Sequence, residues 1–266
     1  MSLRERVAGV DFSGARDAGK NIWIAEGIVT TTGVKIERLQ RAADLTDGGT
    51  AFAPALNALV GHVETLNDHV VGFDFPFSLP AQLIPDTNWS AFVHRFATEF
   101  KTADQFRNHC RDLTGGREHK RATDTEARVP WCAYNLRLYR QTWAGIRHVL
   151  YPLIEHDTAR IIPTQKPVSG KPLIAEICPA STLKAEELYV PYKGRGDDLR
   201  SARADILKSV TRRGLLSPVR GRLWDTIIDN PGGDALDAVL SAIAAARIAD
   251  TEPRSGLDQI ECRVFF

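Results

Sequence analysis

Two short apolar runs, each with an aspartate near its carboxyl end, place the strongest constraint on the fold of this chain. Residues 7–12 read VAGVDF, and residues 69–75 read HVVGFDF. A short, continuous apolar run is typical of a strand that is buried on both faces of a sheet. Asp11 and Asp74 then stand at the carboxyl ends of two buried strands, which is where sites form in open α/β sheets.

Hydrophobic patterning predicts further elements in the first half of the chain. Residues 21–29 and 34–39 alternate well enough for strands and, with the first apolar run, predict a three-stranded meander. Helical spacing of apolar side chains predicts helices over residues 51–66 and 134–150. The second of these helices carries a single apolar stripe, made of Leu136, Tyr139, Trp143, Ile146 and Leu150.

The second half of the chain adds one strand and several helices. Residues 171–179, KPLIAEICP, predict a fifth strand that carries Glu176. Residues 181–189 and 198–213 have the spacing of polar helices. A last helix opens after Pro231 and two glycines and runs through DALDAVLSAIAAARIA.

The order of these elements narrows the architecture. A three-strand meander followed by alternating helix and strand predicts a mixed five-stranded sheet with helices on both faces. This order is that of the ribonuclease H-like group or of its relatives, the actin and sugar-kinase ATPases. The 266 residues fit a single domain, 1–266. Residues 77–133, whose periodicity is weak, are expected to form a largely helical insertion.

Composition excludes several classes of protein. Hydrophobic residues make up 43% and charged residues 25%, which is ordinary for a globular chain and argues against disorder. The net charge of +1 provides no global attraction to nucleic acid or to an anionic membrane. No apolar run approaches the roughly 20 residues that span a bilayer. The four cysteines show no CxxC spacing, so we expect reduced thiols and a cytoplasmic protein.

Carboxylates at strand and helix ends form the candidate site. The last helix carries two aspartates three residues apart on one face, and the fifth strand carries a glutamate. Buried ionised carboxylates need a compensating cation, and Mg²⁺ or Mn²⁺ prefers carboxylate oxygens. These acids are therefore candidate catalytic residues: Asp11, Asp74, Asp234 and Asp237 as metal ligands, and Glu176 as a possible further member.

Three of these acids also have an alternative, purely structural role, which the sequence leaves open. Asp11 precedes a Gly-rich turn, to which its side chain could hydrogen-bond. Asp234 follows two glycines and could be a helix N-cap. Asp74 could stabilise a bend before Pro76.

Four blocks of the sequence resemble a known family. The blocks are VAGVDFSGA, VVGFDFPFSLP, AEICPAST and GGDALDAVLSAIAAARI. They resemble the predicted nuclease family labelled domain of unknown function 429, most specifically at Asp74-Pro76-Leu79-Pro80 and at Asp234 to Ala238. The resemblance covers most of the chain. It implies the ribonuclease H-like fold of Holliday-junction resolvases, with metal carboxylates at Asp11, Asp74, Asp234 and Asp237 and an accessory role for Glu176.

The predicted helix over residues 134–150 also carries basic residues away from its apolar stripe. Arg137, Arg140 and Arg147 could track a phosphate backbone, and Trp131 and Tyr134 could stack on bases. The alternative is an ordinary solvated helix face beside core aromatic residues.

The function that these residues favour is a metal-dependent hydrolase of phosphodiester bonds, a nuclease that uses Mg²⁺ or Mn²⁺ to activate water. Two other classes stay open. One is an ATP phosphotransferase of the actin and sugar-kinase type, with phosphate bound at Gly232-Gly233 before the last helix. The other is a catalytically silent protein that binds nucleic acid. Zinc is disfavoured because the histidines and cysteines near residue 110 fit no standard spacing.

Overall fold

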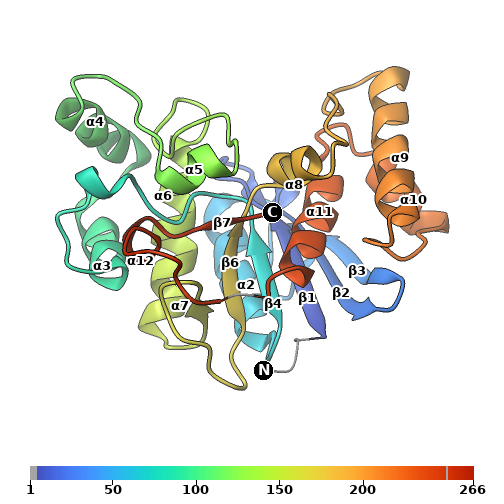
Figure 1. Cartoon of the computed structure of the whole chain (residues 1–266), viewed down its shortest axis with the longest axis horizontal. Helices are drawn as coiled ribbons and strands as arrows, with labels where there is room; N and C mark the ends of the chain where they lie inside the picture. Colours follow the sequence, from blue (N-terminus) through green and yellow to red (C-terminus); the bar gives the residue numbers. More distant parts are fainter. Residues whose placement is uncertain (1–4, 250) are drawn as a thin grey trace.

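A mixed β-sheet runs through the centre of the protein (Figure 1). The computed structural model describes residues 5–249 and 251–266. The sheet is built from β1 (Arg6–Asp11), β2 (Trp23–Thr30), β3 (Gly33–Arg41), β4 (Val70–Phe73), β5 (Arg160–Ile161), β6 (Leu173–Ile177) and β7 (Val264–Phe265). The strand order is β3-β2-β1-β4-β6-β5, and β7 also pairs with β6.

Strand directions divide the sheet into two parts. β2 is antiparallel to both β1 and β3, so the predicted meander is confirmed. β1, β4 and β6 are parallel neighbours. The prediction of five strands was incomplete, because within the described residues two-residue strands β5 and β7 also pair with β6. Strands this short carry no readable alternation, so the sequence pattern does not reveal them.

The helices of the first half of the chain pack largely on one face of the sheet. Ala8, Val10 and Phe73 point to this face and share a core with Leu56 and Leu59 of α2 (Phe52–Thr65). The same core takes in side chains from α6 (Tyr139–Gly145) and α7 (Tyr151–Glu155). The short helices α1 (Ala18–Asn21) and η1 (Ala42–Asp44) lie beside α2.

The opposite face is covered by helices from the end of the chain. Val7 and Ala25 share a core with Leu236, Val239 and Ile243 of α11 (Asp234–Ala246). Three further helices add side chains to this core: α8 (Pro179–Ala185), α9 (Asp197–Arg212) and α10 (Gly221–Ile228). Helices on both faces were expected, and the long helix predicted over residues 198–213 is confirmed as α9.

The predicted insertion over residues 77–133 is largely helical. It contains η2 (Ala81–Leu83), α3 (Trp89–Glu99), α4 (Ala103–Leu113) and α5 (Ala122–Glu126). In Figure 1, α3 and α4 lie at the opposite end of the molecule from α9 and α10. The C-terminal helix α12 (Asp258–Glu261) packs against α3 and α5.

The helix predicted over residues 134–150 begins later than expected. Regular helix starts at Tyr139, continues through the π-helical turn η3 (Ile146–Leu150) and ends with α7 at Glu155. The side chain of Asn135 accepts a hydrogen bond from Arg137 N at 2.8 Å, which holds the chain in a turn and competes with helix. Leu136, placed in the apolar stripe by spacing alone, is 66% exposed.

The helix predicted over residues 181–189 is shifted to α8. Pro179 favours an early start because its fixed φ angle suits the first helical turn. Glu187, which adopts a positive φ of 55°, lies in the turn that follows. Residues 188–196 therefore form a loop that reaches the carboxyl ends of the parallel strands. Among the described residues, none of the helices is long and apolar enough to cross a membrane.

Candidate metal centre

Three carboxylates meet at the carboxyl ends of β1 and β4. Ligand oxygens of Asp11, Asp74 and Asp237, here called the acidic triad, all lie within 4.8 Å of one another. Val10 pairs with Phe73 in the sheet, so the residues that follow them are neighbours, and Asp74 N donates to Val10 O at 3.1 Å. Asp11 and Asp74 therefore lie close together at the carboxyl ends of adjacent parallel strands.

Strand alternation aims both aspartates at α11. Successive side chains on a strand point to opposite faces, so Asp11 shares the face of Val7 and Gly9, which is the face that α11 covers. Asp74, which directly follows β4, shares the face of Gly72, where an added Cβ atom would lie 3.0 Å from Ser241 O on α11. The triad therefore forms in the narrow space between sheet and helix.

Small residues bring α11 close enough to deliver the third carboxylate. A Cβ atom added to Gly9 would overlap the backbone of Ala238 and Ala242, so the helix rests directly on β1. Gly9 is required by this close approach. Asp237 precedes Ala238 on the same inward side of α11 and is only 1% exposed. Its burial between sheet and helix is a consequence of this contact.

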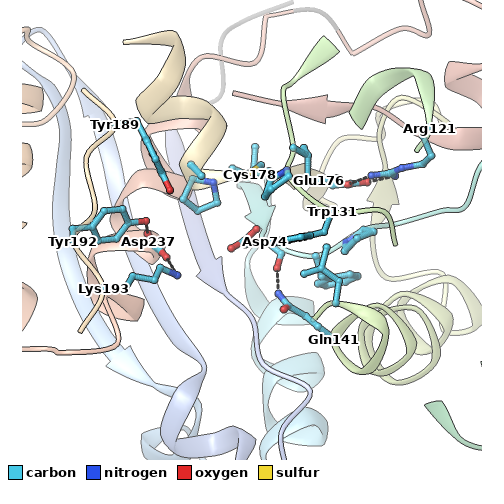
Figure 2. A pocket seen from close by; sticks show the side chains of 18 of the residues that line it. Asp74, Arg121, Trp131, Gln141, Glu176, Cys178, Tyr189, Tyr192, Lys193 and Asp237 are labelled. Carbon is cyan, nitrogen blue, oxygen red and sulfur yellow. Dashed lines mark hydrogen bonds and ion pairs between the residues drawn. The ribbon is translucent and has the colours of Figure 1, made fainter. Parts of the chain in front are cut away.

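Asp237 has two polar partners from the loop after α8. Tyr192 Oη donates to Asp237 Oδ1 at 2.5 Å, and Lys193 Nζ lies 2.5 Å from Asp237 Oδ2 (Figure 2). The Lys193 side chain is 54% exposed, whereas the carboxylate that it reaches is buried. Lys193 therefore places a positive charge beside the triad without being enclosed there.

Burial and charge repulsion shift the pKa values of Asp11 and Asp74. Burial, and then repulsion from Asp237, raises the pKa of Asp74 to about 7. The same two causes, in the same order, hold the pKa of Asp11 well above its ordinary value. The nearby Lys193 acts in the opposite direction on both groups. A further cation would stabilise carboxylates whose pKa is raised in this way, because it favours their charged form.

The triad offers a suitable donor set for a hard divalent cation. Carboxylate oxygens are the ligands that Mg²⁺ and Mn²⁺ prefer. Oxygens that bind one Mg²⁺ at about 2.1 Å lie at most about 4.2 Å apart, so the triad needs to close only slightly. The three residues fit such an ion by chemistry and by spacing.

Asp234 lies beside the triad rather than within it. As predicted, it is in the first turn of α11, but Gly233, not Asp234, is the N-cap. Its half-buried carboxylate folds back over Gly232, and its charge contributes to the raised pKa of Asp11. Asn230 Oδ1 accepts from Ala235 N at 3.2 Å, so this helix end already has an internal partner. One N–H of this helix end therefore has a side-chain partner, and the Asp234 carboxylate lies beside Gly232, where the phosphate site was considered.

Glu176 is directed away from the triad by strand alternation. It pairs with Phe73 in the sheet, and so points to the face that α2 covers rather than to the α11 face. There its carboxylate contacts Arg121 Nη2 at 2.5 Å and accepts from Phe77 N at 2.9 Å. Glu176 is 3% exposed, and its partners are an arginine and the backbone.

The other predicted contact residues are scattered. Arg137 lies before α6, with its guanidinium 4.9 Å from the Trp131 ring centroid. Arg140 is on α6, and Arg147, in the π-helical turn, is half-buried and donates to Phe100 O at 3.4 Å. Tyr134, considered as a ring that could stack on a base, is 1% exposed and belongs instead to the core.

A cavity of about 410 Å³ opens beside the triad (Figure 2). Its floor includes Asp74 and Asp237. Its walls come from the segment before α6, which carries Trp131, and from the loop after α8, which carries Tyr189 and Lys193. Two segments that lie far apart in the sequence therefore enclose space directly over the carboxylates.

Sequence reasoning missed Tyr192 and Lys193. They lie in a loop without periodicity, about 45 residues before the carboxylate that they contact, so no local pattern marks them. The buried Arg121 was also missed as the partner of Glu176. Only the fold brings these pairs together.

The fold and the site define a class of molecule. It is a mixed α/β protein with a buried acidic triad at the carboxyl ends of adjacent parallel strands. Comparison of the chain with protein-family models, with curated proteins and with solved structures finds no match. The functional argument therefore depends on the chemistry of the site itself.

Proposed function

We propose that this protein is a metal-dependent phosphodiesterase of the ribonuclease H-like type, a nuclease that holds Mg²⁺ or Mn²⁺ on Asp11, Asp74 and Asp237. The observation that carries this proposal is the convergence of three largely buried carboxylates within 4.8 Å. Burying such groups together is unfavourable unless a cation joins them. A divalent ion held there supplies charge neutralisation at phosphate and lowers the pKa of water.

Topology and sequence support the ribonuclease H-like assignment. The meander, the antiparallel β2 and the parallel run β1-β4-β6 match the order of elements expected for that group. The resemblance to domain of unknown function 429 implies metal carboxylates at the same three positions. It also includes Asp234, which lies close enough to affect the pKa of Asp11 and is suited to an outer position around the ion.

The chain's own residues have separate tasks in this proposal. Lys193 balances the negative charge of the triad and, because its side chain is half-exposed, it can also attract a phosphate. Tyr192 orients the Asp237 carboxylate through its hydrogen bond. Cys178 lines the same cavity, but burial and the charge of Asp74 raise the pKa of its thiol to about 12. It therefore stays protonated and is a poor nucleophile.

The test is the variant Asp11→Asn, assayed with single-stranded and duplex substrates in Mn²⁺ or Mg²⁺. Changes to residues that merely support a metal ligand cost about 10–100-fold, so loss of a ligand should cost at least about 100-fold in cleavage. The metal-free variant should melt at the same temperature as wild type or higher, because it loses a repelling charge and keeps its shape. Asp205→Asn, on the surface of α9, is the matched control.

A purely structural Asp11 predicts a different pair of results. Loss of a charge-assisted buried hydrogen bond would lower the stability of the metal-free variant by about 1.5–3 kcal/mol. It would leave the rise in melting temperature on adding Mn²⁺ intact. That combination, or wild-type cleavage in the variant, would contradict the proposal.

A further inference from the structure

Two exposed aromatic rings line the cavity beside the acidic triad. Trp131 is 36% exposed and Tyr189 is 49% exposed, although both are large apolar side chains. They come from different segments, and in the view of Figure 2 Asp74 lies between them. Both rings therefore offer flat apolar surface to the cavity that the carboxylates also line, rather than packing in the core.

Each of these rings has a cation over it from outside the cavity. Arg137 lies 4.9 Å from the Trp131 ring centroid, and Lys184 Nζ lies 5.3 Å from that of Tyr189. Arg137 and Lys184 are not among the residues that line the cavity, so each covers ring surface outside it. The cations hold the rings in place and add positive charge near the rim.

The size of the cavity limits what can lie between the rings. About 410 Å³ is at the small end of the range of ligand pockets, which runs from about 300 to 1,000 Å³. This space suits one planar heterocycle, whereas a stacked base pair within a duplex would not enter it. Bases reach such pockets only when they are unpaired and unstacked.

We propose that the Trp131–Tyr189 cavity binds a single unpaired nucleobase and thereby selects single-stranded nucleic acid. This inference rests on the proposed function, because it places the base next to the phosphodiester that the acidic triad would hold. Stacking on aromatic rings tolerates any base, so the cavity provides selection for strandedness rather than for sequence. Lys193 lines the same cavity and contacts Asp237 of the triad, so it is positioned to meet the phosphate of the bound nucleotide.

The test compares two fluorescein-labelled octamers, oligodeoxythymidine and an abasic strand of equal length, by anisotropy in EDTA. Both strands carry the same phosphates, so the ratio of their affinities isolates binding of the base. Stacking typically contributes between about 5- and 150-fold per base. Wild type should prefer the octamer with bases by that factor, and Trp131→Ala with Tyr189→Ala should reduce the ratio to near one. The variants Trp131→Phe and Tyr189→Phe should retain most of it.

Phe266→Ala is the matched control, because Phe266 is also 36% exposed but lies outside the cavity. It should leave the affinity ratio unchanged. Equal affinity of wild type for the two octamers, including no measurable binding of either, would overturn the base cavity. So would an unchanged ratio in the alanine double variant, whose fold is checked by thermal melting.

Cleavage in Mn²⁺ separates this inference from the function on which it rests. If the base preference is present but no strand is cleaved, the proposed function fails and the cavity stands. If wild type cleaves and the double variant cleaves single strands and duplex in the same proportion as wild type, the function stands and the cavity is overturned.

Discussion

Lys193 supplies the positive charge closest to the acidic triad. Its ammonium contacts Asp237 and lowers the pKa of both Asp11 and Asp74, against the effect of their burial. An ammonium is a compact point charge on a flexible four-carbon stem, unlike the planar, rigid fork of an arginine. The triad therefore has a partial counter-charge in its metal-free form that leaves room for a stronger cation.

Protonation of Asp74 should couple stability and metal binding to pH. The pKa of Asp74 is about 7 in the folded protein, against about 3.9 for an unfolded aspartate. A folded pKa above the unfolded value means that this group stabilises the protein fully below about pH 4. Its contribution, at most about 4 kcal/mol, is lost as pH rises through about 7.

The prediction is read from the difference between wild type and Asp74→Asn, because other groups titrate in the same range. In EDTA the wild type should lose stability relative to the variant between pH 5 and pH 8 in urea unfolding. In Mn²⁺ the wild-type stability should instead increase over this range, because the ion binds the deprotonated form. A difference that stays constant with pH would show that Asp74 titrates normally.

At the scale of elements, the contact of α11 with β1 decides whether the site exists. The helix presents small residues, Ala238 and Ala242 among them, to a glycine on the strand. This arrangement brings two backbones together without side chains between them. Asp237 reaches the strand ends because it lies one residue before the contact.

Gly9→Ala should therefore impair the site and the fold together. The added methyl group would push α11 from the sheet, at a cost of about 1–3 kcal/mol. The rise in melting temperature on adding Mn²⁺ should shrink, because Asp237 would move away from Asp11. Urea unfolding and thermal melts with and without Mn²⁺ measure the two effects.

Gly61→Ala is the matched control for this change. Gly61 is an exposed position of α2, and a Cβ atom there would meet nothing within 4 Å. The substitution should stabilise the protein by up to about 1 kcal/mol, because alanine favours helix over glycine. Equal effects of the two substitutions would contradict the role given to the α11 contact.

At the scale of the whole molecule, Arg121 joins parts of the chain that are distant in sequence. It is 1% exposed and lies 2.6 Å from Asp124 of α5 and 2.5 Å from Glu176 of β6. It also donates to Glu261 O of α12 at 3.0 Å. The insertion, the sheet and the C-terminal segment therefore meet at one guanidinium, which also lines the cavity.

Arg121→Met should destabilise the protein by about 3–5 kcal/mol, because it leaves two buried carboxylates without their cation. The matched control is Arg200→Met, whose arginine pairs with Asp229 in an exposed ion pair, with side chains 49% and 53% exposed. Exposed pairs contribute little to stability. Urea unfolding of both variants checks the prediction. A loss in Arg121→Met no greater than that in the control would mean that the buried network adds little.

Much of the fold could be predicted from local pattern. The apolar runs of β1 and β4 and the alternation of β2 and β3 identified the sheet, because burial of a strand is visible in its own residues. The start of α6 and the bounds of α8 were harder to predict from the sequence. They depend on the Asn135 turn and on Pro179, whose local effects compete with hydrophobic spacing.

The candidate site divides in the same way. The sequence by itself determined that Asp11 and Asp74 follow buried strands and that Asp237 lies on a helix of small residues. The sequence also contains the alternation of each strand. The register between β4 and β6 pairs Glu176 with Phe73, and this pairing directs Glu176 to the face opposite α11. Only the tertiary structure decided that Lys193, Tyr192 and Trp131 join the site. These three residues lie in loops that have no periodic pattern. Their positions depend on where the flanking helices and strands pack, because that packing fixes the two ends of each loop.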